Sequence, residues 1–319
     1  MSTNGGEFVF YHYTPSIAAA AIFTVLFLAS AAWHAKQLIS SRAWYFIPFV
    51  VGCLFEAVGY LGRILSWAER PDYTKNPYII QSLLLLLAPA VFAASIYMIL
   101  GRLIVRLEAD SYSIIRPRWL TKFFILGDVL SFCAQGGGGG MLATAKSRED
   151  SRRGEQIILG GLGIQILFFG FFIVVSFIFH LRIRRKPTRR SYALTTPWKG
   201  LLYVLYTSSI LIMIRSVFRI IEYVMGSDGE LLSKEVYLYI FDAVPMFVVC
   251  VIFNWFHPSR VISKDDKEPI ASVTSLEVLG DDPEAAGRRK SMQWSTIPTG
   301  GYAQGQGYSQ QPQGYSRDY

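Results

Sequence analysis

Charged residues are scarce in this chain. Asp, Glu, Lys and Arg make up 17% of its 319 residues and 52% are hydrophobic, whereas an ordinary soluble domain carries about a quarter charged residues. The apolar residues fall into blocks of about twenty, the length of a helix that crosses roughly 30 Å of hydrocarbon. The composition therefore predicts one membrane domain rather than two soluble ones.

Several chemical signatures are also missing. The three cysteines, Cys53, Cys133 and Cys250, lie inside apolar blocks, so we expect no disulfide framework between loops. The chain has no Walker motif or aspartyl-phosphate signature, and its glycine run at 136–140 is not followed by Gly-Lys-Ser/Thr. We therefore expect no enzymatic activity and no cofactor. The glycine run predicts close helix packing or a broken, flexible helix.

The apolar blocks predict an all-α fold, a polytopic bundle of seven transmembrane helices. They cover roughly residues 16–36, 44–66, 78–103, 120–142, 156–180, 199–222 and 236–256. We expect an extracellular N-terminus at 1–15 and a membrane domain at 16–258. The polar residues 259–319 predict a disordered cytosolic tail, because they cannot bury enough apolar surface to fold.

The basic residues indicate how the helices are oriented. The formal net charge is +8, but the Lys and Arg residues lie between apolar blocks, unlike those on a soluble nucleic-acid-binding surface, so we expect no nucleic-acid partner. Fourteen lie in the first, third and fifth connections, against seven in the second, fourth and sixth. Because positive residues near helix ends stay cytosolic, this ratio predicts an N-out, C-in topology.

Ionisable side chains interrupt the apolar blocks at a regular spacing. Such residues are expensive in a membrane and often mark a functional site. Four pairs are separated by seven residues, which places both members on one helix face two turns apart. The pairs are Glu56 and Arg63, Asp128 and Gln135, Arg215 and Glu222, and Glu235 and Asp242, with Arg219 on the same face as Arg215.

These nine residues are our candidate pathway for a substrate or ion. With the predicted topology most of them lie in the outer half of the helices, and Glu56 and Asp128 lie nearer the middle, so they could line one outward-opening cavity. The set holds three positive and five negative side chains, a surplus that would suit a positively charged group. The alternative interpretation is that they are structural ion pairs between helices, with no ligand.

Other polar residues in the blocks favour structural roles. Gln81 and Gln165 are single amides in apolar helices, which predicts hydrogen bonds between helices. His34, His180 and His257 fall at predicted cytosolic helix ends and could bind zinc at one depth, as in seven-helix hydrolases of lipid amides. No spacing such as His-x-x-x-His occurs, so we expect an interfacial role and no metal site.

Short motifs along the helices form a specific combination. The early ones are Tyr13-Thr14-Pro15-Ser16, Glu56-Ala57-Val58-Gly59-Tyr60-Leu61-Gly62-Arg63, Tyr78 with Gln81, Ala88-Pro89 and Gly101-Arg102. The later ones are Asp128, Ser131 and Gln135, Gly161-Leu162 with Gln165, Ile214-Arg215 through Phe218-Arg219 to Glu222-Tyr223, Glu235, Tyr239, Phe241-Asp242 and His257-Pro258. Together, over roughly residues 11–258, they resemble the fungal RTA-like (resistance to aminocholesterol) lipid-translocating exporter family.

The resemblance implies a membrane transporter or translocator of sphingoid long-chain bases or similar cationic amphiphiles, linked to resistance to toxic amphiphilic compounds. Its partners would be membrane lipids and an amphiphilic lipid substrate, and the sequence leaves protein partners unknown. The protonated amine of a sphingoid base would complement the acidic surplus. We expect a multi-pass protein of the plasma membrane, with an endomembrane as the alternative location.

A heptahelical lipid sensor or receptor-like regulator is the alternative function, because it shares the N-out topology and basic cytosolic face. Receptor motifs are missing, however. The third block ends in Leu100-Gly101-Arg102 instead of Asp/Glu-Arg-Tyr, and the seventh has no Asn-Pro-x-x-Tyr. These absences favour transport.

Overall fold

The structure is a computed structural model that describes residues 16–68, 75–145, 147–194, 196–225 and 235–262. The described residues form helices and no strand, which confirms the all-α fold. The elements are α1 (Ile17–Ser41), η1 (Trp44–Phe46), α2 (Ile47–Ala68), α3 (Lys75–Arg106), η2 (Asp110–Tyr112), α4 (Pro117–Thr144), α5 (Arg148–Arg185), α6 (Arg189–Ala193), α7 (Trp198–Met225), α9 (Glu235–Leu238), η3 (Tyr239–Ala243), α10 (Val244–Trp255) and η4 (Pro258–Arg260). The predicted N-terminal segment 1–15 and nearly all of the predicted tail lie outside the described residues.

Each predicted apolar block coincides with a long helix, and the seventh block is the continuous run of α9, η3 and α10. Among the described residues, six helices are long and apolar enough to cross a membrane. They are Ile17–Ser41, Trp44–Ala68, Ile80–Arg106, Glu149–Arg185, Trp198–Met225 and Glu235–Arg260. The helix outside this set is α4, whose 28 residues include the glycine run, Asp128 and Gln135, all of which lower its hydropathy. A seventh span and the N-out topology stay predictions.

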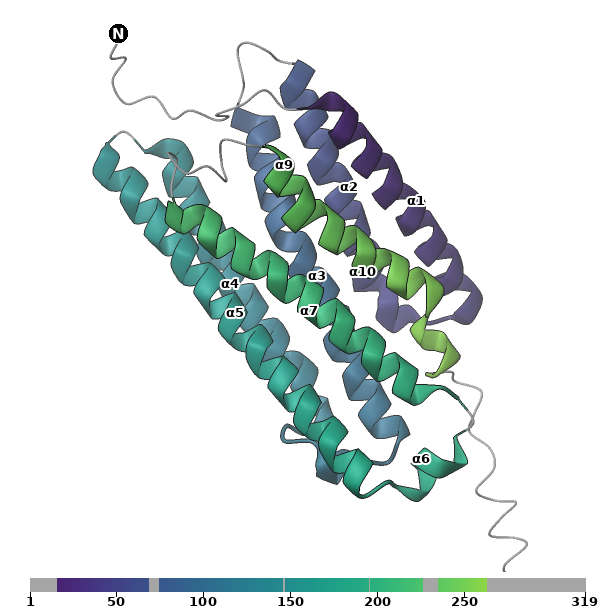
Figure 1. The fold of residues 1–319 in the computed structure, drawn as a ribbon. Helices are drawn as coiled ribbons and strands as arrows, with labels where there is room; N and C mark the ends of the chain where they lie inside the picture. The colour runs from purple at the N-terminus through teal and green to yellow at the C-terminus, as the bar shows by residue number, and fades with distance from the viewer. Residues whose placement is uncertain (1–15, 69–74, 146, 195, 226–234, 263–319) are drawn as a thin grey trace, which may run out of the picture. The chain divides into compact units, whose positions relative to one another are not determined.

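The long helices pack in a closed sequence of neighbours (Figure 1). Helix α2 packs between α1 and α3, and α4 packs between α3 and α5. Helix α7 contacts α3, α5 and α10, and α10 returns to α1. Segments far apart in the sequence therefore meet along α7 and the α9–η3–α10 run, where several candidate residues lie.

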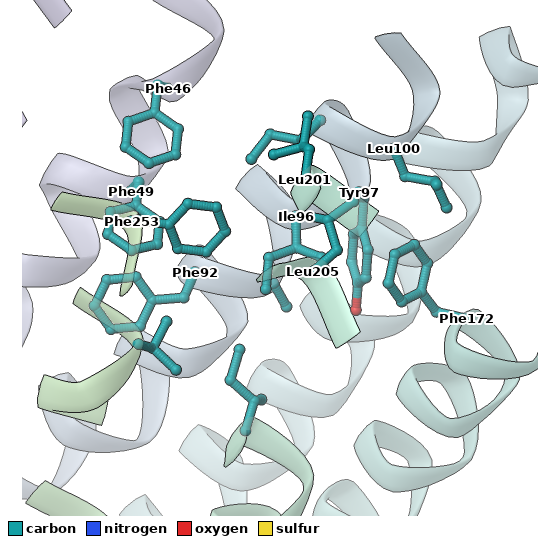
Figure 2. Close-up of a cluster of buried hydrophobic side chains, with 14 of the residues drawn as sticks. Phe46, Phe49, Phe92, Ile96, Tyr97, Leu100, Phe172, Leu201, Leu205 and Phe253 are labelled. Carbon is teal, nitrogen blue, oxygen red and sulfur yellow. The ribbon is translucent and has the colours of Figure 1, made fainter. Parts of the chain in front are cut away.

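Aromatic side chains from several helices pack together inside this bundle (Figure 2). The Phe49 ring lies 4.8 Å from the Phe92 ring and 4.9 Å from the Phe253 ring, which joins α2, α3 and α10. Farther across, the Tyr97 ring lies 4.6 Å from Phe172 of α5. Phe49 is near the start of α2 and Arg63 near its end. The Phe49 contacts and the ionic contacts of Arg63 thus lie near opposite ends of α2.

The glycine run lies inside α4, which continues as one helix through it. A Cβ atom on Gly138 would lie 2.6 Å from the carbonyl oxygen of Gly154 in α5, and one on Gly154 would lie 2.9 Å from the Gly138 carbonyl oxygen. The prediction of close packing is confirmed at this crossing, and the alternative of a broken helix is wrong. The remaining glycines of the run have no such neighbour within 4 Å.

Candidate functional site

The nine candidate residues lie in two clusters. Seven of them form what we call the ion network, between α2, α7 and the α9–η3–α10 run: Glu56, Arg63, Arg215, Arg219, Glu222, Glu235 and Asp242. Asp128 and Gln135 lie on α4 and contact α3 and α5, and we call them and their partners the α4 cluster. A cavity that unites the two clusters stays a prediction.

Arg63 and Glu235 form one part of the ion network. Arg63 donates hydrogen bonds to Glu235 Oε1 from Nε at 3.0 Å and from Nη2 at 2.9 Å. The backbone N–H of Ser16 donates to both Glu235 oxygens, at 3.0 and 2.8 Å, and the Tyr239 hydroxyl donates at 3.2 Å. Since Ser16 is the N-cap of α1, Glu235 ties together α1, α2 and α9.

Asp242 is the centre of the other part of the ion network, which also contains Arg215, Arg219 and Glu222. It is fully buried, and its two carboxylate oxygens accept hydrogen bonds from Arg215 Nε and Arg219 Nη2. Arg219 also donates from Nη1 to Glu222 at 2.8 Å. Because Arg215 and Arg219 are four residues apart on α7, both face the same partner helix.

A wide turn lies directly before this contact. Residues Tyr239–Ala243 form a π-helix in which the Val244 N–H donates to the Tyr239 carbonyl, five residues back. Such turns insert one extra residue and often occur at functional sites. The seven-residue spacing of Glu235 and Asp242 therefore does not place them on one face of a regular α-helix, and they bind different arginines.

Arg215 also binds a backbone carbonyl that lacks its helical hydrogen bond because of a proline. Its Nη2 donates to the carbonyl oxygen of Leu85 in α3. Pro89 lies four residues after Leu85 inside the same helix, and proline has no N–H with which to complete the helical hydrogen bond to that carbonyl. Pro89 thus leaves the Leu85 carbonyl free to accept a hydrogen bond from a charged residue of α7.

Glu56 has a different environment from the other acids. It is fully buried, and neither carboxylate oxygen accepts a hydrogen bond from a described residue. Asp242, Arg215 and Arg219 are close enough to act on it electrostatically. The three arginines of the network are matched by the three acids that they bind, Glu222, Glu235 and Asp242. One acid of the predicted surplus is therefore Glu56.

Asp128 is the other surplus acid. It is 5% exposed, its polar neighbour is the Tyr97 hydroxyl, and no Lys or Arg in the part of the chain that the structure describes forms an ion pair with it. A buried carboxylate without a cationic partner is costly when ionised, so such a group favours binding a proton or a cation. Glu56 and Asp128 are the two positions where a positively charged group would gain most.

The rest of the α4 cluster is a chain of polar contacts between α4 and α5. Gln135 donates to Gln165 Oε1 at 3.1 Å and to the Ser131 hydroxyl oxygen at 2.6 Å. Ser131 in turn donates to the Gly161 carbonyl at 2.7 Å. The predicted interhelical role is confirmed for Gln165. Gln81 is buried in α3 and also has an interaction partner.

The three histidines do not lie together: His34 and His257 are neighbours, and His180 has other contacts. The rings of His34 and His257 are 6.5 Å apart, and His34 Nε2 donates to the Cys250 carbonyl at 3.2 Å. His180 instead stacks on Tyr206, with ring centroids 5.6 Å apart. Within the described ranges no group of three His, Cys, Asp or Glu side chains is arranged to hold a metal ion.

Sequence reasoning missed several members of the site. They are the Ser16 N–H, the Leu85 carbonyl, and the hydroxyl groups of Tyr97 and Tyr239. Two had a signal in the sequence: Tyr239 follows Glu235 by four residues, which puts it on the same helix face, and Pro89 marks the open carbonyl of Leu85. The other two have no local signature.

Comparisons with known proteins show which family the chain resembles. The profile of the family described as RTA1 like protein matches residues 49–265. Protoporphyrin uptake protein 1 of Saccharomyces cerevisiae is 40% identical over 80% of this chain and 93% of its own length. Probable lipid transporter atnI of Emericella nidulans is 31% identical over 83% and 71%. Sphingoid long-chain base transporter RSB1 of S. cerevisiae is 25% identical over 70% and 67%.

No solved structure gives a significant match to the chain. The family profile covers more than half of the residues, and the similarity to protoporphyrin uptake protein 1 extends over 80% of the chain. The chain itself has six helices in its described residues that are long and apolar enough to cross a membrane. The family includes fungal proteins named as lipid transporters. This chain therefore belongs to the RTA1-like family of multi-pass membrane proteins.

Proposed function

We propose that the chain moves a positively charged amphiphile across the membrane, with sphingoid long-chain bases as the substrate class. In this proposal α4 is a seventh span, the topology is N-out and C-in, and the protein acts in the plasma membrane and contributes to resistance to toxic amphiphiles. The observation that carries the proposal is Glu56, a fully buried carboxylate without a hydrogen-bond partner among the described residues.

The charge balance of the site supports a cationic substrate. The paired arginines and acids of the ion network neutralise one another, so they leave no net charge for a ligand. Glu56 and Asp128 remain, each in a different cluster. A protonated amine that binds one of them would remove the cost of an unpaired buried charge. Its alkyl tail would remain in the lipid between helices.

The names of two relatives each contain a different substrate. One relative is named for sphingoid long-chain base transport and another for protoporphyrin uptake. Protoporphyrin carries carboxyl groups, which the surplus acids would not complement. The charge of the site therefore favours the base, and protoporphyrin is the rival substrate for any transport assay.

The test is reconstitution of the full chain in sealed vesicles with a labelled long-chain base. We expect faster transbilayer movement than in protein-free vesicles, and no faster movement of the N-acylated, uncharged counterpart. Glu56→Gln should lower the rate at least about tenfold, corresponding to about 1.4 kcal/mol. Glu149→Gln is the matched control, because Glu149 is 74% exposed in an ion pair with Arg153.

Three results would contradict the proposal. The first is movement of the base equal to that in protein-free vesicles under all pH and ion gradients. The second is equal movement of the base and its acylated form. The third is movement of protoporphyrin but not of the base.

A lipid sensor without transport activity is the second candidate, and the closed state of the ion network favours it. Arg63, Arg215 and Asp242 are at most 2% exposed and bind other groups of the protein. A sensor would bind the base with Glu56-dependent affinity and leave its transbilayer movement unchanged.

A further inference from the structure

A hollow lies where α5, α6 and α7 come together, on residues that the proposed transport does not use. Its volume is about 280 Å³. The lining includes two cations, Arg184 and Lys199, the hydroxyl-bearing residues Ser191 and Tyr192, and the indole of Trp198. We call it the basic hollow. It is close to the lower end of the size range of ligand pockets, about 300 Å³, and would hold a headgroup-sized molecule.

Hydrogen bonds hold the walls of the basic hollow in place. Thr188 is the N-cap of α6: its hydroxyl oxygen accepts from the Ser191 N–H at 3.1 Å and donates to the Leu107 carbonyl at 2.7 Å. The indole N–H of Trp198 donates to the Ser191 carbonyl at 3.2 Å. These bonds fix the short helix α6 to the ends of α3 and α7. A preformed site binds its ligand at a lower entropic cost.

The charge around the basic hollow is of one sign. Residues 182–199 contain seven Lys and Arg and no Asp or Glu. Arg184 and Lys199 are exposed, and neither forms an ion pair with a described residue; the Lys199 ammonium group lies 5.6 Å over the Trp198 ring. Tryptophan and tyrosine at helix ends prefer the headgroup layer of a membrane. We therefore expect the unneutralised cations to lie at the depth of the lipid phosphates.

We propose that the basic hollow binds the headgroup of an anionic phospholipid, whose phosphate oxygens accept hydrogen bonds from Arg184 and Lys199. Clusters of four to eight basic residues directly beside a membrane helix, and basic pockets between such helices, recognise anionic lipid headgroups. Basic residues that only set the topology would need no hollow and no fixed walls. The basic hollow lies at the start of α7, whereas the α7 residues of the ion network lie near its end. A bound lipid would therefore contact α7 at the end opposite to the ion network.

The test uses the full chain in nanodiscs of phosphatidylcholine, titrated with short-chain phosphatidylinositol. Removing both cations in Arg184→Gln/Lys199→Gln should weaken binding about thirtyfold, and each single change about fivefold, at about 1 kcal/mol for each cation near an anionic surface. Native mass spectrometry should show the loss of one retained phosphatidylinositol. The readout is lipid binding, so it is independent of whether the chain transports a lipid.

The matched control is Arg118→Gln/Lys122→Gln on α4. This pair also consists of one exposed arginine and one exposed lysine, and Lys122 lies 5.3 Å over the Trp119 ring, but neither residue lines the basic hollow. We expect the control to bind phosphatidylinositol as the unmodified chain does. Equal weakening in both double variants, or in neither, would overturn the proposal. Displacement of the lipid by inorganic phosphate of matching affinity would assign the hollow to free phosphate and also overturn it.

Discussion

Asp242 neutralises two arginines of α7 at once, so the ion network should depend strongly on it. In Asp242→Asn the side chain keeps its size, but among the described residues Arg215 loses the one acid with which it forms an ion pair, and Arg219 keeps its ion pair with Glu222. Removal of one partner of a buried ion pair costs about 3–5 kcal/mol, because the other charge is left uncompensated. We expect this loss in the free energy of unfolding, measured by denaturant titration in detergent.

The control for this change is Glu149→Gln, which removes an acid from an exposed ion pair. Exposed pairs contribute only about 0–1 kcal/mol, so we expect little change in unfolding. Glu56→Gln supplies a second comparison, since it removes a buried carboxylate that no described residue binds and should not destabilise the fold. If all three variants unfold alike, the ion network contributes nothing measurable to stability.

At the scale of elements, the crossing of α4 and α5 depends on the glycine that faces the partner helix. Gly138→Ala would put a Cβ atom 2.6 Å from the Gly154 carbonyl oxygen, and backbone atoms can give way only if the helices move apart. Overpacking of this kind costs about 1–3 kcal/mol. Gly139→Ala meets no atom within 4 Å and should be neutral or stabilising, because alanine favours the helix. Thermal unfolding of both variants tests the crossing, and equal melting temperatures would contradict it.

The helices themselves could be predicted from the sequence, because a helix that crosses roughly 30 Å of hydrocarbon needs about twenty consecutive apolar residues, and such blocks are visible in the sequence. Helix α5 shows the limit of that signal. Hydropathy predicted residues 156–180, but the helix extends over Arg148–Arg185, since its polar ends need no lipid to remain helical. Its N-cap, Ser147, accepts a hydrogen bond from the Asp150 N–H, a local pattern that hydropathy does not register.

The candidate site was predictable only within each helix. Spacing placed Arg215 and Arg219 on one face of α7, and both are buried there. Their shared partner Asp242 is more than twenty residues away and follows the wide turn of η3, so no periodicity of the sequence could connect them. The surplus of two acids was also predicted, but only the contacts identify Glu56 and Asp128 as its members.

At the scale of the whole molecule, the question is whether α4 crosses the membrane, because this determines whether the two ends of the chain lie on the same side or on opposite sides. Six other helices are long and apolar enough to cross. An even number of crossings leaves both ends on one side, whereas a crossing by α4 puts them on opposite sides. Helix α4 has 28 residues, and at 1.5 Å per residue this length exceeds the roughly 30 Å of hydrocarbon. Its two acidic or amide residues, Asp128 and Gln135, are buried against α3 and α5.

We therefore expect that α4 crosses and that the ends are separated. An epitope tag before Met1 should be labelled by antibody in intact cells, and a tag after Tyr319 only after permeabilisation, because the excess of Lys and Arg in the odd-numbered connections holds that side in the cytosol. A tag inserted directly after Ser111, in the third connection, serves as the internal control and should behave like the C-terminal tag. Labelling of both terminal tags in the same condition would mean an even number of spans. In that case Asp128 could not lie on a path through the bilayer, and Glu56 alone would remain as the acid for a cationic substrate.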